Sequence, residues 1–472
     1  MPRPLVLLLA LLTLAFAAVA VLLAPLGGVF TGGAAKLVCS AIFVAGRDEA
    51  AVREQELERL SSPGKYLGLA DVRVDHDERA VHASLFGLWP RTAIERPGIG
   101  CTAAEGIGVA ELRAQGAGIR PAPAVHASLL WPEGEAVDTA HPPANVDSAR
   151  LTAALERAFA EPDPARPRRT RAVVVVHGGR IVAERYGEGF GPHTAHLSNS
   201  IAKSVTGALV GILVGEGRLD LAAPAPIAEW QRPDDPRRAI TLEDLLRMRS
   251  GLAFEENYSK VRSDITLMWA GGDLAGFAAA KPLVAPPGTR WQYSTGTANI
   301  LGRIVSEAAG ESFSERVSFP RRALFDPLGM RTAVLEVDAR GHFVGGSLVF
   351  ASARDYARFG LLYLRDGVWN GRRILPPGWV AQTRTPTPEA PPEWAYGFQI
   401  WLNSGADPSV RRWPRLPADA FAMLGHQQQH VVMIPSHDLV VVRMGLSEFD
   451  NWRLEDLVTD VMAAARPAPA DS

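Results

Sequence analysis

The chain opens with a long run of apolar residues. Residues 4–35 contain no charged side chain, and residues 5–24 have about the length that spans the hydrocarbon core of a bilayer, roughly 30 Å. A cleaved secretory signal peptide is the alternative, because Arg3 supplies a positive start and residues 33–35 are small enough for a cleavage site. The run is longer than the roughly 7–15 apolar residues of a typical signal. The pattern therefore favours an uncleaved membrane anchor within residues 1–35.

Shorter patterns follow this segment. Residues 48–60 place leucine at helical spacing among alternating charges, which predicts a short helix facing solvent. Brief alternating apolar runs between residues 66 and 131, interrupted by proline and glycine, predict a small β-rich module. The Pro- and Glu-rich stretch at 132–145 is typical of a linker. Residues 36–145 are thus expected to form a small N-terminal module and its linker.

The rest of the chain has strand patterns at both ends and helical patterns between them. Amphipathic helices are predicted over residues 148–160 and 454–465. β-Branched runs predict two hairpins, at residues 171–176 with 181–186 and at residues 431–434 with 439–444. This order indicates an α+β fold, in which one antiparallel sheet is flanked by helices and joined to a mostly helical subdomain. The domain is expected over residues 146–466, before a disordered tail at 467–472.

Composition limits the class of partner. With 47% hydrophobic and 21% charged residues, the 472-residue chain lies in the globular range. Its net charge of −2 gives no electrostatic reason to expect nucleic acid, so a small molecule is the expected partner. Lysine is so scarce that each one needs an explanation. The only lysines are Lys36, Lys65, Lys203, Lys260 and Lys281.

The only cysteines are Cys39 and Cys101. In an exported protein they could pair into one disulfide outside the larger domain, and two unpaired small apolar residues are the alternative. The 11 histidines are scattered without a metal-ligand motif, so neither a metal nor a cofactor is expected. The expected location is the bacterial inner membrane, with the domain at residues 146–466 in the periplasm, or outside the cell if the first segment is cleaved.

The first candidate for chemistry is the pair Ser200 and Lys203, at the start of a very apolar helix. Residues three apart share one helix face. A serine hydroxyl is a weak nucleophile until a base takes its proton, and an ordinary lysine, with a pKa of about 10.4, is charged. Burial in so apolar a helix should lower the pKa of Lys203 and make it that base. Free N–H groups at the helix start can also hold an oxyanion. An N-cap serine beside an exposed lysine is the alternative.

Two later segments could complete a site. Tyr293 lies in a loop rich in Pro and Gly that leads into a helix starting near Thr297, so its phenol can point into a cleft. Residues 424–430, Leu-Gly-His-Gln-Gln-Gln-His, form a polar cluster at the start of a buried strand and can offer side chains and backbone N–H groups to a substrate. Taken alone, the first is more often a packed surface aromatic, and the second is equally compatible with a polar loop.

The three segments together resemble the ordered motifs of class C β-lactamases, D-alanyl-D-alanine carboxypeptidases, related esterases and 6-aminohexanoate-dimer hydrolases, here Ser200-x-x-Lys203, Tyr293-Ser294-Thr295 and Gly425-His426. The resemblance covers roughly residues 148–466. It implies a β-lactamase/transpeptidase-like fold and metal-independent hydrolysis of a small amide or ester.

The resemblance also implies roles. Ser200 would be acylated, Lys203 and Tyr293 would move its proton, and water would then release the acyl group. The oxyanion would be held by the backbone N–H of Ser200 and by one on the strand near Gln429. The residues expected to contact substrate are Thr295, His426, Gln428 and Gln429.

Two positions depart from the family pattern. At the position of Thr295 the family pattern often has asparagine. A threonine there resembles the amide-dimer hydrolase branch more than true β-lactamases. Gln428 stands where the third motif normally ends in glycine. Its side chain must make the cleft narrower or change its polarity. An amide or ester other than penicillin is therefore the expected substrate. The alternative function, which Gln428 favours, is a non-catalytic relative that binds cell-wall peptides or a partner protein.

Overall fold

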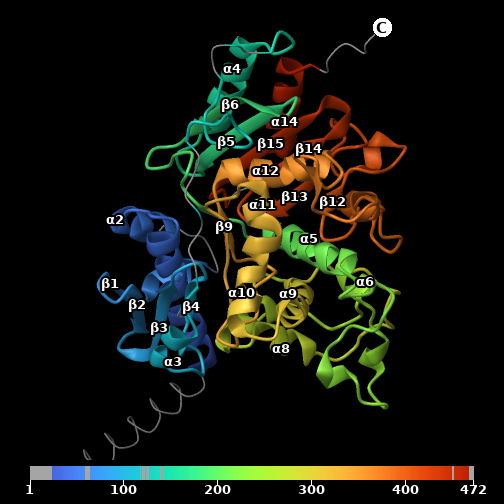
Figure 1. The fold of residues 1–472 in the computed structure, drawn as a ribbon. Helices are drawn as coiled ribbons and strands as arrows, with labels where there is room; N and C mark the ends of the chain where they lie inside the picture. The colour runs from blue at the N-terminus through green and yellow to red at the C-terminus, as the bar shows by residue number, and fades with distance from the viewer. Residues whose placement is uncertain are drawn as a thin grey trace, which may run out of the picture.

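The computed structural model describes residues 24–58, 64–116, 118–119, 123, 127–138, 141, 143–448 and 451–466 (Figure 1). Residues 5–23, which hold most of the predicted anchor, and the predicted tail at 467–472 lie outside this part of the chain. The described residues form a larger body and a smaller N-terminal module at its side (Figure 1).

A six-stranded antiparallel sheet lies at the centre of the larger body. Its strand order is β12-β13-β14-β15-β5-β6, so strands from both ends of the domain meet where β15 pairs with β5. The strands are β5 (Thr170–His177), β6 (Arg180–Tyr186), β12 (Trp401–Leu402), β13 (Phe421–Gly425), β14 (Gln429–Ile434) and β15 (Leu439–Gly445). The two predicted hairpins are present as β5 with β6 and β14 with β15.

Helices cover both faces of this sheet. Side chains alternate across a strand, so Val174 and Val176 of β5 pack in one layer while Val173 and Val175 pack in the other. The helices are α5 (Ile201–Gly215) and α12 (Ala353–Leu364) in the first layer, and α4 (Ser148–Phe159) and α14 (Leu454–Ala464) in the second. A strand buried on both faces has to be apolar throughout, which explains the continuous valine run.

A mostly helical region lies between β6 and β12 in the sequence and packs below the sheet (Figure 1). Its α-helices are α6 (Leu242–Leu246), α7 (Asp264–Leu267), α8 (Leu274–Ala279), α9 (Thr295–Ala309), α10 (Phe313–Pro320), α11 (Asp326–Leu328) and α13 (Trp379–Thr383). The short 3-10 and π-helical segments of the body are η4 (Ala228–Trp230), η5 (Pro236–Ala239), η6 (Met268–Ala270), η7 (Arg321–Phe325), η8 (Pro392–Trp394), η9 (Pro408–Val410) and η10 (Pro435–His437). The small strands are β7 (His196–Leu197), β8 (Val334–Leu335), β9 (Val349–Ala351), β10 (Val368–Trp369) and β11 (Arg372–Arg373). The predicted α+β class is confirmed.

The N-terminal module is a helix packed against a four-stranded antiparallel sheet. Residues 24–39 are helical and continue as η1 (Ser40–Val44). This segment is long and apolar enough to cross a membrane, yet most of it is buried within the protein. The other elements are α2 (Glu49–Val52), η2 (Arg53–Glu58), η3 (Gly64–Leu69), β1 (Asp71–Asp75), β2 (Ala80–Leu85), β3 (Leu88–Arg96), β4 (Gly100–Ala103) and α3 (Val109–Gln115). The two cysteines pair: a disulfide joins Cys39 to Cys101 of β4, with their Cα atoms 6.0 Å apart.

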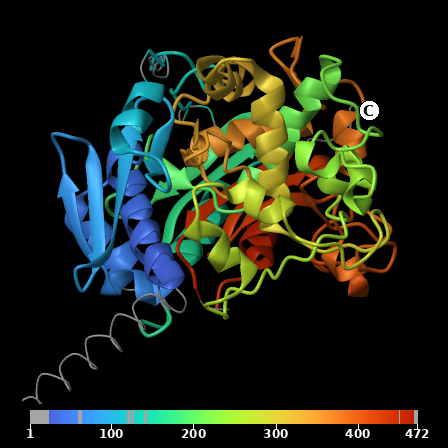
Figure 2. The same cartoon turned by 90° about the horizontal axis from the view of Figure 1, so that it is seen from below.

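Buried ion pairs attach the module to the larger body. Lys36 pairs with Glu336, whose fully buried carboxylate also accepts hydrogen bonds from Ser40 Oγ at 2.9 Å and the Cys101 N–H at 2.7 Å. In Figure 2 the N-terminal helix lies between the strands of the module and the larger body. Arg171 of β5 donates to Glu56 of η2 at 2.5 Å. Because Glu56 is buried, the helix predicted at residues 48–60 does not simply face solvent.

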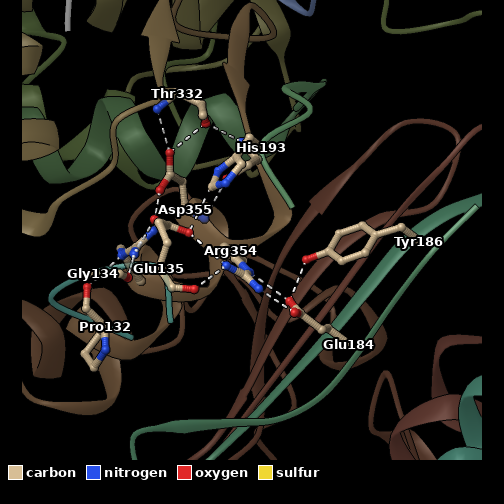
Figure 3. Close-up of polar contacts among 11 residues, drawn as sticks. Pro132, Gly134, Glu135, Glu184, Tyr186, His193, Thr332, Arg354 and Asp355 are labelled. Carbon is tan, nitrogen blue, oxygen red and sulfur yellow. Dashed lines mark hydrogen bonds and ion pairs between the residues drawn. The ribbon is translucent and has the colours of Figure 1, made fainter. Parts of the chain in front are cut away.

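The predicted linker is bound to the larger body where it starts. Arg354 of α12 donates to Glu135 Oε2 at 3.0 Å (Figure 3). Arg358, one helical turn further on, donates to the backbone carbonyls of Pro132 at 2.9 Å and Gly134 at 2.6 Å. The two arginines thereby fix the start of the Pro- and Glu-rich stretch against α12.

Candidate active site

Ser200 is the last residue before α5, at the end of a tight turn. β7 ends at Leu197, and Asn199 turns the chain with a left-handed φ of 46°, which asparagine tolerates better than most residues. The Asn199 side chain donates to the backbone carbonyl of His426 at 2.9 Å. This contact holds the serine turn against the turn between β13 and β14.

Lys203 lies one turn along α5 and its side chain is buried. Its Nζ lies 2.9 Å from each of three oxygens: Ser200 Oγ, Thr295 Oγ1 and the carbonyl O of Gly346. The last contact needs a glycine, because a Cβ on Gly346 would lie 2.7 Å from Thr295 Cγ2. All three acceptors are neutral, and within the described residues no carboxylate forms an ion pair with Lys203.

Burial lowers the pKa of Lys203 from 10.5 to about 8, and the nearby charge of Glu256 offsets only part of this effect. A neutral amine keeps two N–H groups and gains one lone pair. The Gly346 carbonyl can only accept, and the Thr295 hydroxyl already gives its own hydrogen to Glu256. A neutral Lys203 therefore donates to these two oxygens and turns its lone pair to the Ser200 hydroxyl, as a general base requires.

Glu256 orients Thr295 for this contact. Its Oε1 accepts from Thr295 Oγ1 at 2.5 Å and its Oε2 accepts from the Thr295 backbone N–H at 2.8 Å. The Tyr258 hydroxyl also donates to Oε1, at 3.0 Å. Thr295, predicted as a substrate contact, is thus placed against the catalytic lysine candidate and held there by a carboxylate.

Tyr293 completes the cluster around Ser200. Its ring centre lies 4.8 Å from Lys203 Nζ, and the ring stacks on Trp401 at 5.2 Å. Burial and the charge of Glu256 raise the pKa of Tyr293 above its ordinary value of 10, against smaller lowering effects of a hydrogen bond with Ser200 and the charge of Arg412. The phenol is therefore protonated at neutral pH. The structure brings together the three residues that the sequence predicted as catalytic.

The third motif forms a hairpin turn beside the serine. β13 ends at Gly425, residues 426–428 form the turn, and Gln429 begins β14. Gly425 packs directly on the serine turn, since a Cβ there would lie 2.2 Å from the Ser198 carbonyl O. Gln428 has a left-handed φ of 65°, which is costly for a residue with a Cβ. The close backbone approach that requires glycine is therefore at Gly425.

The four residues predicted to contact substrate separate into different places. Gln428 lines a cleft beside Ser200, Thr295 lines a second cavity on its other side, and His426 lines both. Gln429 is buried, and its side-chain Oε1 accepts a hydrogen bond from the Gly445 N–H of β15 at 2.9 Å. Its side chain thus supports the hairpin.

The two cavities meet at Ser200. An aromatic cleft of about 650 Å³ has Trp291, Tyr293, Trp394 and Trp401 in its wall, together with Arg412, and a more apolar cavity of about 290 Å³ lies next to it. Ser200, Tyr258 and His426 line both spaces. The rings of Tyr258 and His426 stack 4.9 Å apart and nearly parallel, at 8°. This stacked pair lies at the boundary between the cleft and the cavity.

The family model described as Beta-lactamase matches residues 153–457, which include all the residues of the cluster around Ser200. The chain belongs to the β-lactamase family. Its N-terminal module lies outside this match. Membership supports a hydrolase activity of the serine-hydrolase type.

Two relatives match part of the chain. The chain is 28% identical over 295 residues to the 6-aminohexanoate-dimer hydrolase of Paenarthrobacter ureafaciens, covering 58% of this chain and 72% of the relative. It is 30% identical over 260 residues to protein Rv1367c of Mycobacterium tuberculosis, covering 44% of this chain and 63% of the relative.

Two solved structures share the fold. A Bacillus anthracis protein named after the 6-aminohexanoate-dimer hydrolases has a TM-score of 0.52 at 24% identity, covering 63% of this chain and 78% of that chain. SurE has a TM-score of 0.51 at 20% identity, covering 69% of this chain and 78% of that chain. The resemblance to both is one of fold.

Several residues of the site carry no signal in the sequence. Glu256 and Tyr258 lie in an irregular loop, and Arg412 and Trp401 come from segments without a recognisable motif. Residues 29–35 were predicted within the anchor or signal segment and residues 36–40 within the small module, whereas residues from both parts contribute to the wall of the cavity beside Ser200. Only the tertiary packing brings these segments to the nucleophile.

Proposed function

We propose that this protein is a metal-independent serine hydrolase that cleaves an ester or amide through an acyl-enzyme on Ser200. The observation that carries the proposal is the hydrogen bonding of Lys203, whose two neutral acceptors, Thr295 and Gly346, leave its lone pair to the serine. No step needs a metal. The one group of possible metal ligands among the described residues, Asp273, Asp338 and His342, lines neither cavity at Ser200.

Lys203 and Tyr293 divide the proton transfers. Ser200 Oγ bonds to the carbonyl carbon of the substrate while its proton passes to Lys203, the group with the pKa of about 8. Tyr293 keeps its proton at neutral pH, because burial raises its pKa. It can donate that proton to the departing oxygen or nitrogen and recover one from Lys203. Water then attacks the acyl-enzyme along the reverse path.

The oxyanion is held by two backbone N–H groups. One is that of Ser200 at the start of α5, as the family pattern implies. For the second we infer His426 in place of a residue near Gln429, because His426 follows the glycine that packs on the serine turn. Each such donor typically contributes about 2.7–4 kcal/mol of transition-state stabilisation.

The substrate is a small amide or ester. The relative from Paenarthrobacter ureafaciens is by name a hydrolase of a 6-aminohexanoate dimer, which is consistent with an amide. Gln428 lines the cleft with a side chain where the family pattern has glycine, so a penicillin fits the proposal less well.

The location follows from the N-terminus. We propose that residues 5–24 anchor the protein in the bacterial inner membrane and that the hydrolase domain, residues 146–466, lies in the periplasm, or outside the cell if the segment is cleaved. The disulfide between Cys39 and Cys101 supports an oxidising compartment.

The test is covalent labelling of the full chain in nanodiscs with a fluorophosphonate, read as intact mass, together with turnover of p-nitrophenyl acetate. We expect one adduct and ester release for the wild type, and neither for Ser200→Ala. The matched control is Ser204→Ala on the same helix, whose hydroxyl donates to the Gln399 carbonyl at 2.6 Å, away from the site. It should label like the wild type.

A folded wild type that forms no adduct and releases no ester would contradict the proposal. Binding of cell-wall peptides under those conditions would support the alternative, a non-catalytic binding protein.

A further inference from the structure

We propose that the natural substrate carries a linear apolar acyl chain, and that this chain lies in the cavity between Ser200 and the N-terminal helix. The proposal rests on the proposed hydrolase function and names its substrate class. It starts from the cavity of about 290 Å³, whose wall is shared by the hydrolase domain and the helix that precedes it.

One face of the N-terminal helix forms part of this wall. The residues that reach the cavity are Val29, Phe30, Gly33, Lys36, Leu37 and Ser40. Their spacing of one, three and four residues places them along a single helix face. The hydrolase domain supplies apolar residues opposite them, among them Ile265, Leu348 and Phe350.

Charge within the cavity wall is neutralised. The ammonium group of Lys36 is held by Glu336 and by Ser40, to which it donates at 2.8 Å. Its charge is thus compensated by the protein, and its methylene stem is what remains to face an apolar ligand. The cavity therefore recognises a ligand by burial of hydrocarbon, without an anionic group to bind.

The place of Tyr293 decides which part of the substrate enters. Tyr293 lines the aromatic cleft and does not line the apolar cavity. A group that protonates the leaving atom has to lie on the leaving-group side, so the leaving group occupies the aromatic cleft. The acyl group then extends from Ser200 to the other side, past Tyr258 and His426, into the apolar cavity.

The size of the cavity sets the length of the chain. A cavity of about 150 Å³ in another protein holds one benzene ring, so a volume of about 290 Å³ suits on the order of ten carbon atoms.

In the chemical step, Ser200 Oγ bonds to the acyl carbon and the bond from that carbon to oxygen or nitrogen breaks. The leaving group takes a proton, and water returns the fatty acid and free Ser200.

The experiment compares p-nitrophenyl acetate, butyrate, octanoate and decanoate on the full chain in nanodiscs. For the wild type we expect kcat/KM to rise about fourfold for each added methylene group until the cavity is filled. Two variants block the cavity from opposite walls, Val29→Trp on the helix and Ile265→Trp on the hydrolase domain. In both we expect the ratio of decanoate to acetate turnover to fall on the order of fiftyfold.

Val44→Trp provides the matched control, because this valine lies on the same helical segment and does not line the cavity. Its ratio should equal that of the wild type. Partitioning of the longer esters into lipid is the same for every variant, so it cannot explain a lower ratio in the two blocking variants alone. Acetate turnover with no gain for longer chains, or ratios unaffected by both blocking variants, would overturn the acyl-chain proposal and leave the hydrolase intact. Absence of any turnover and of any Ser200 adduct would overturn both.

Discussion

Lys36 and Lys203 are buried lysines on two apolar helices, and they differ in what surrounds the ammonium group. Lys36 meets the carboxylate of Glu336, whereas Lys203 meets three neutral oxygens. Burial lowers the pKa of both lysines. At Lys36 the charge and the hydrogen bond of Glu336 oppose this effect, whereas at Lys203 only the nearby charge of Glu256 opposes it. The same side chain in similar helices therefore serves as an attachment point in one place and as a base in the other.

The two lysines also differ in the purpose that their burial serves. For Lys203, the drop in pKa from 10.5 to about 8 corresponds to about 3 kcal/mol of folding free energy at pH values below 8. The Lys36 pair instead joins the N-terminal module to the hydrolase domain, together with contacts from Ser40 and Cys101.

Replacing Lys203 should produce the largest effect. In Lys203→Met the base is lost while the side-chain volume is kept, so we expect kcat/KM for p-nitrophenyl acetate to fall by about 10³- to 10⁴-fold. The free energy of unfolding should change by less than about 1 kcal/mol, since relief of the buried charge offsets the lost hydrogen bonds. Chemical denaturation beside steady-state kinetics measures both quantities. If Lys203→Met lost activity because it unfolded, Lys203 would have a structural role, as Lys36 does.

Replacing Lys36 should produce the opposite result. Lys36→Met leaves the Glu336 carboxylate buried without its cation, which typically costs about 3–5 kcal/mol of folding free energy. The double variant Lys36→Met with Glu336→Gln removes both charges and should regain most of that loss. Thermal and denaturant unfolding of the wild type, of both single variants, Lys36→Met and Glu336→Gln, and of the double variant measures the coupling free energy. If Lys36→Met and the double variant were both as stable as the wild type, the ion pair would contribute nothing to the attachment of the module.

The fold was predictable because its strands carry local signals. The valine runs of β5 and β15 and the apolar helices are patterns of neighbouring residues, and they predicted the sheet, its two hairpins and α5. The N-terminal helix shows the limit of such patterns. An apolar face that packs against protein and one that faces lipid have the same composition, so the sequence could not reveal the wall that residues 29–40 contribute to the site.

The catalytic cluster was predictable in part for a similar reason. Ser200 and Lys203 share one helix, so their spacing fixed their contact. Tyr293 was found through the order of the motifs. Glu256 and Gly346 reach the cluster only through tertiary packing, and both determine where the lone pair of Lys203 points. The side chain of Gln429 was expected at the substrate, but the pairing of β14 with β15 turns it to Gly445.

The pH dependence of turnover gives the smallest and most specific contrast between the two lysines. Because burial lowers the pKa of Lys203 to about 8, the fraction of neutral base falls about tenfold for each pH unit below 8. We expect kcat/KM for p-nitrophenyl acetate to rise with pH up to about 8 and then to level. Between pH 8 and 10.5 the unfolded chain binds a proton at this lysine that the folded chain does not, so its contribution to stability rises with pH.

Two variants assign that midpoint to Lys203. Glu256→Gln removes the charge that raises the pKa of Lys203, so the midpoint should move to lower pH while the Thr295 hydroxyl keeps an acceptor. The double variant Lys36→Met with Glu336→Gln should leave the midpoint in place, because that pair contacts neither Ser200 nor Lys203 in the structure. A midpoint near 10 in the wild type, or one that Glu256→Gln does not move, would mean that another group accepts the serine proton. A midpoint that Glu256→Gln moves and the double variant leaves in place would instead assign the serine proton to Lys203 and show that the Glu256 carboxylate tunes its proton affinity.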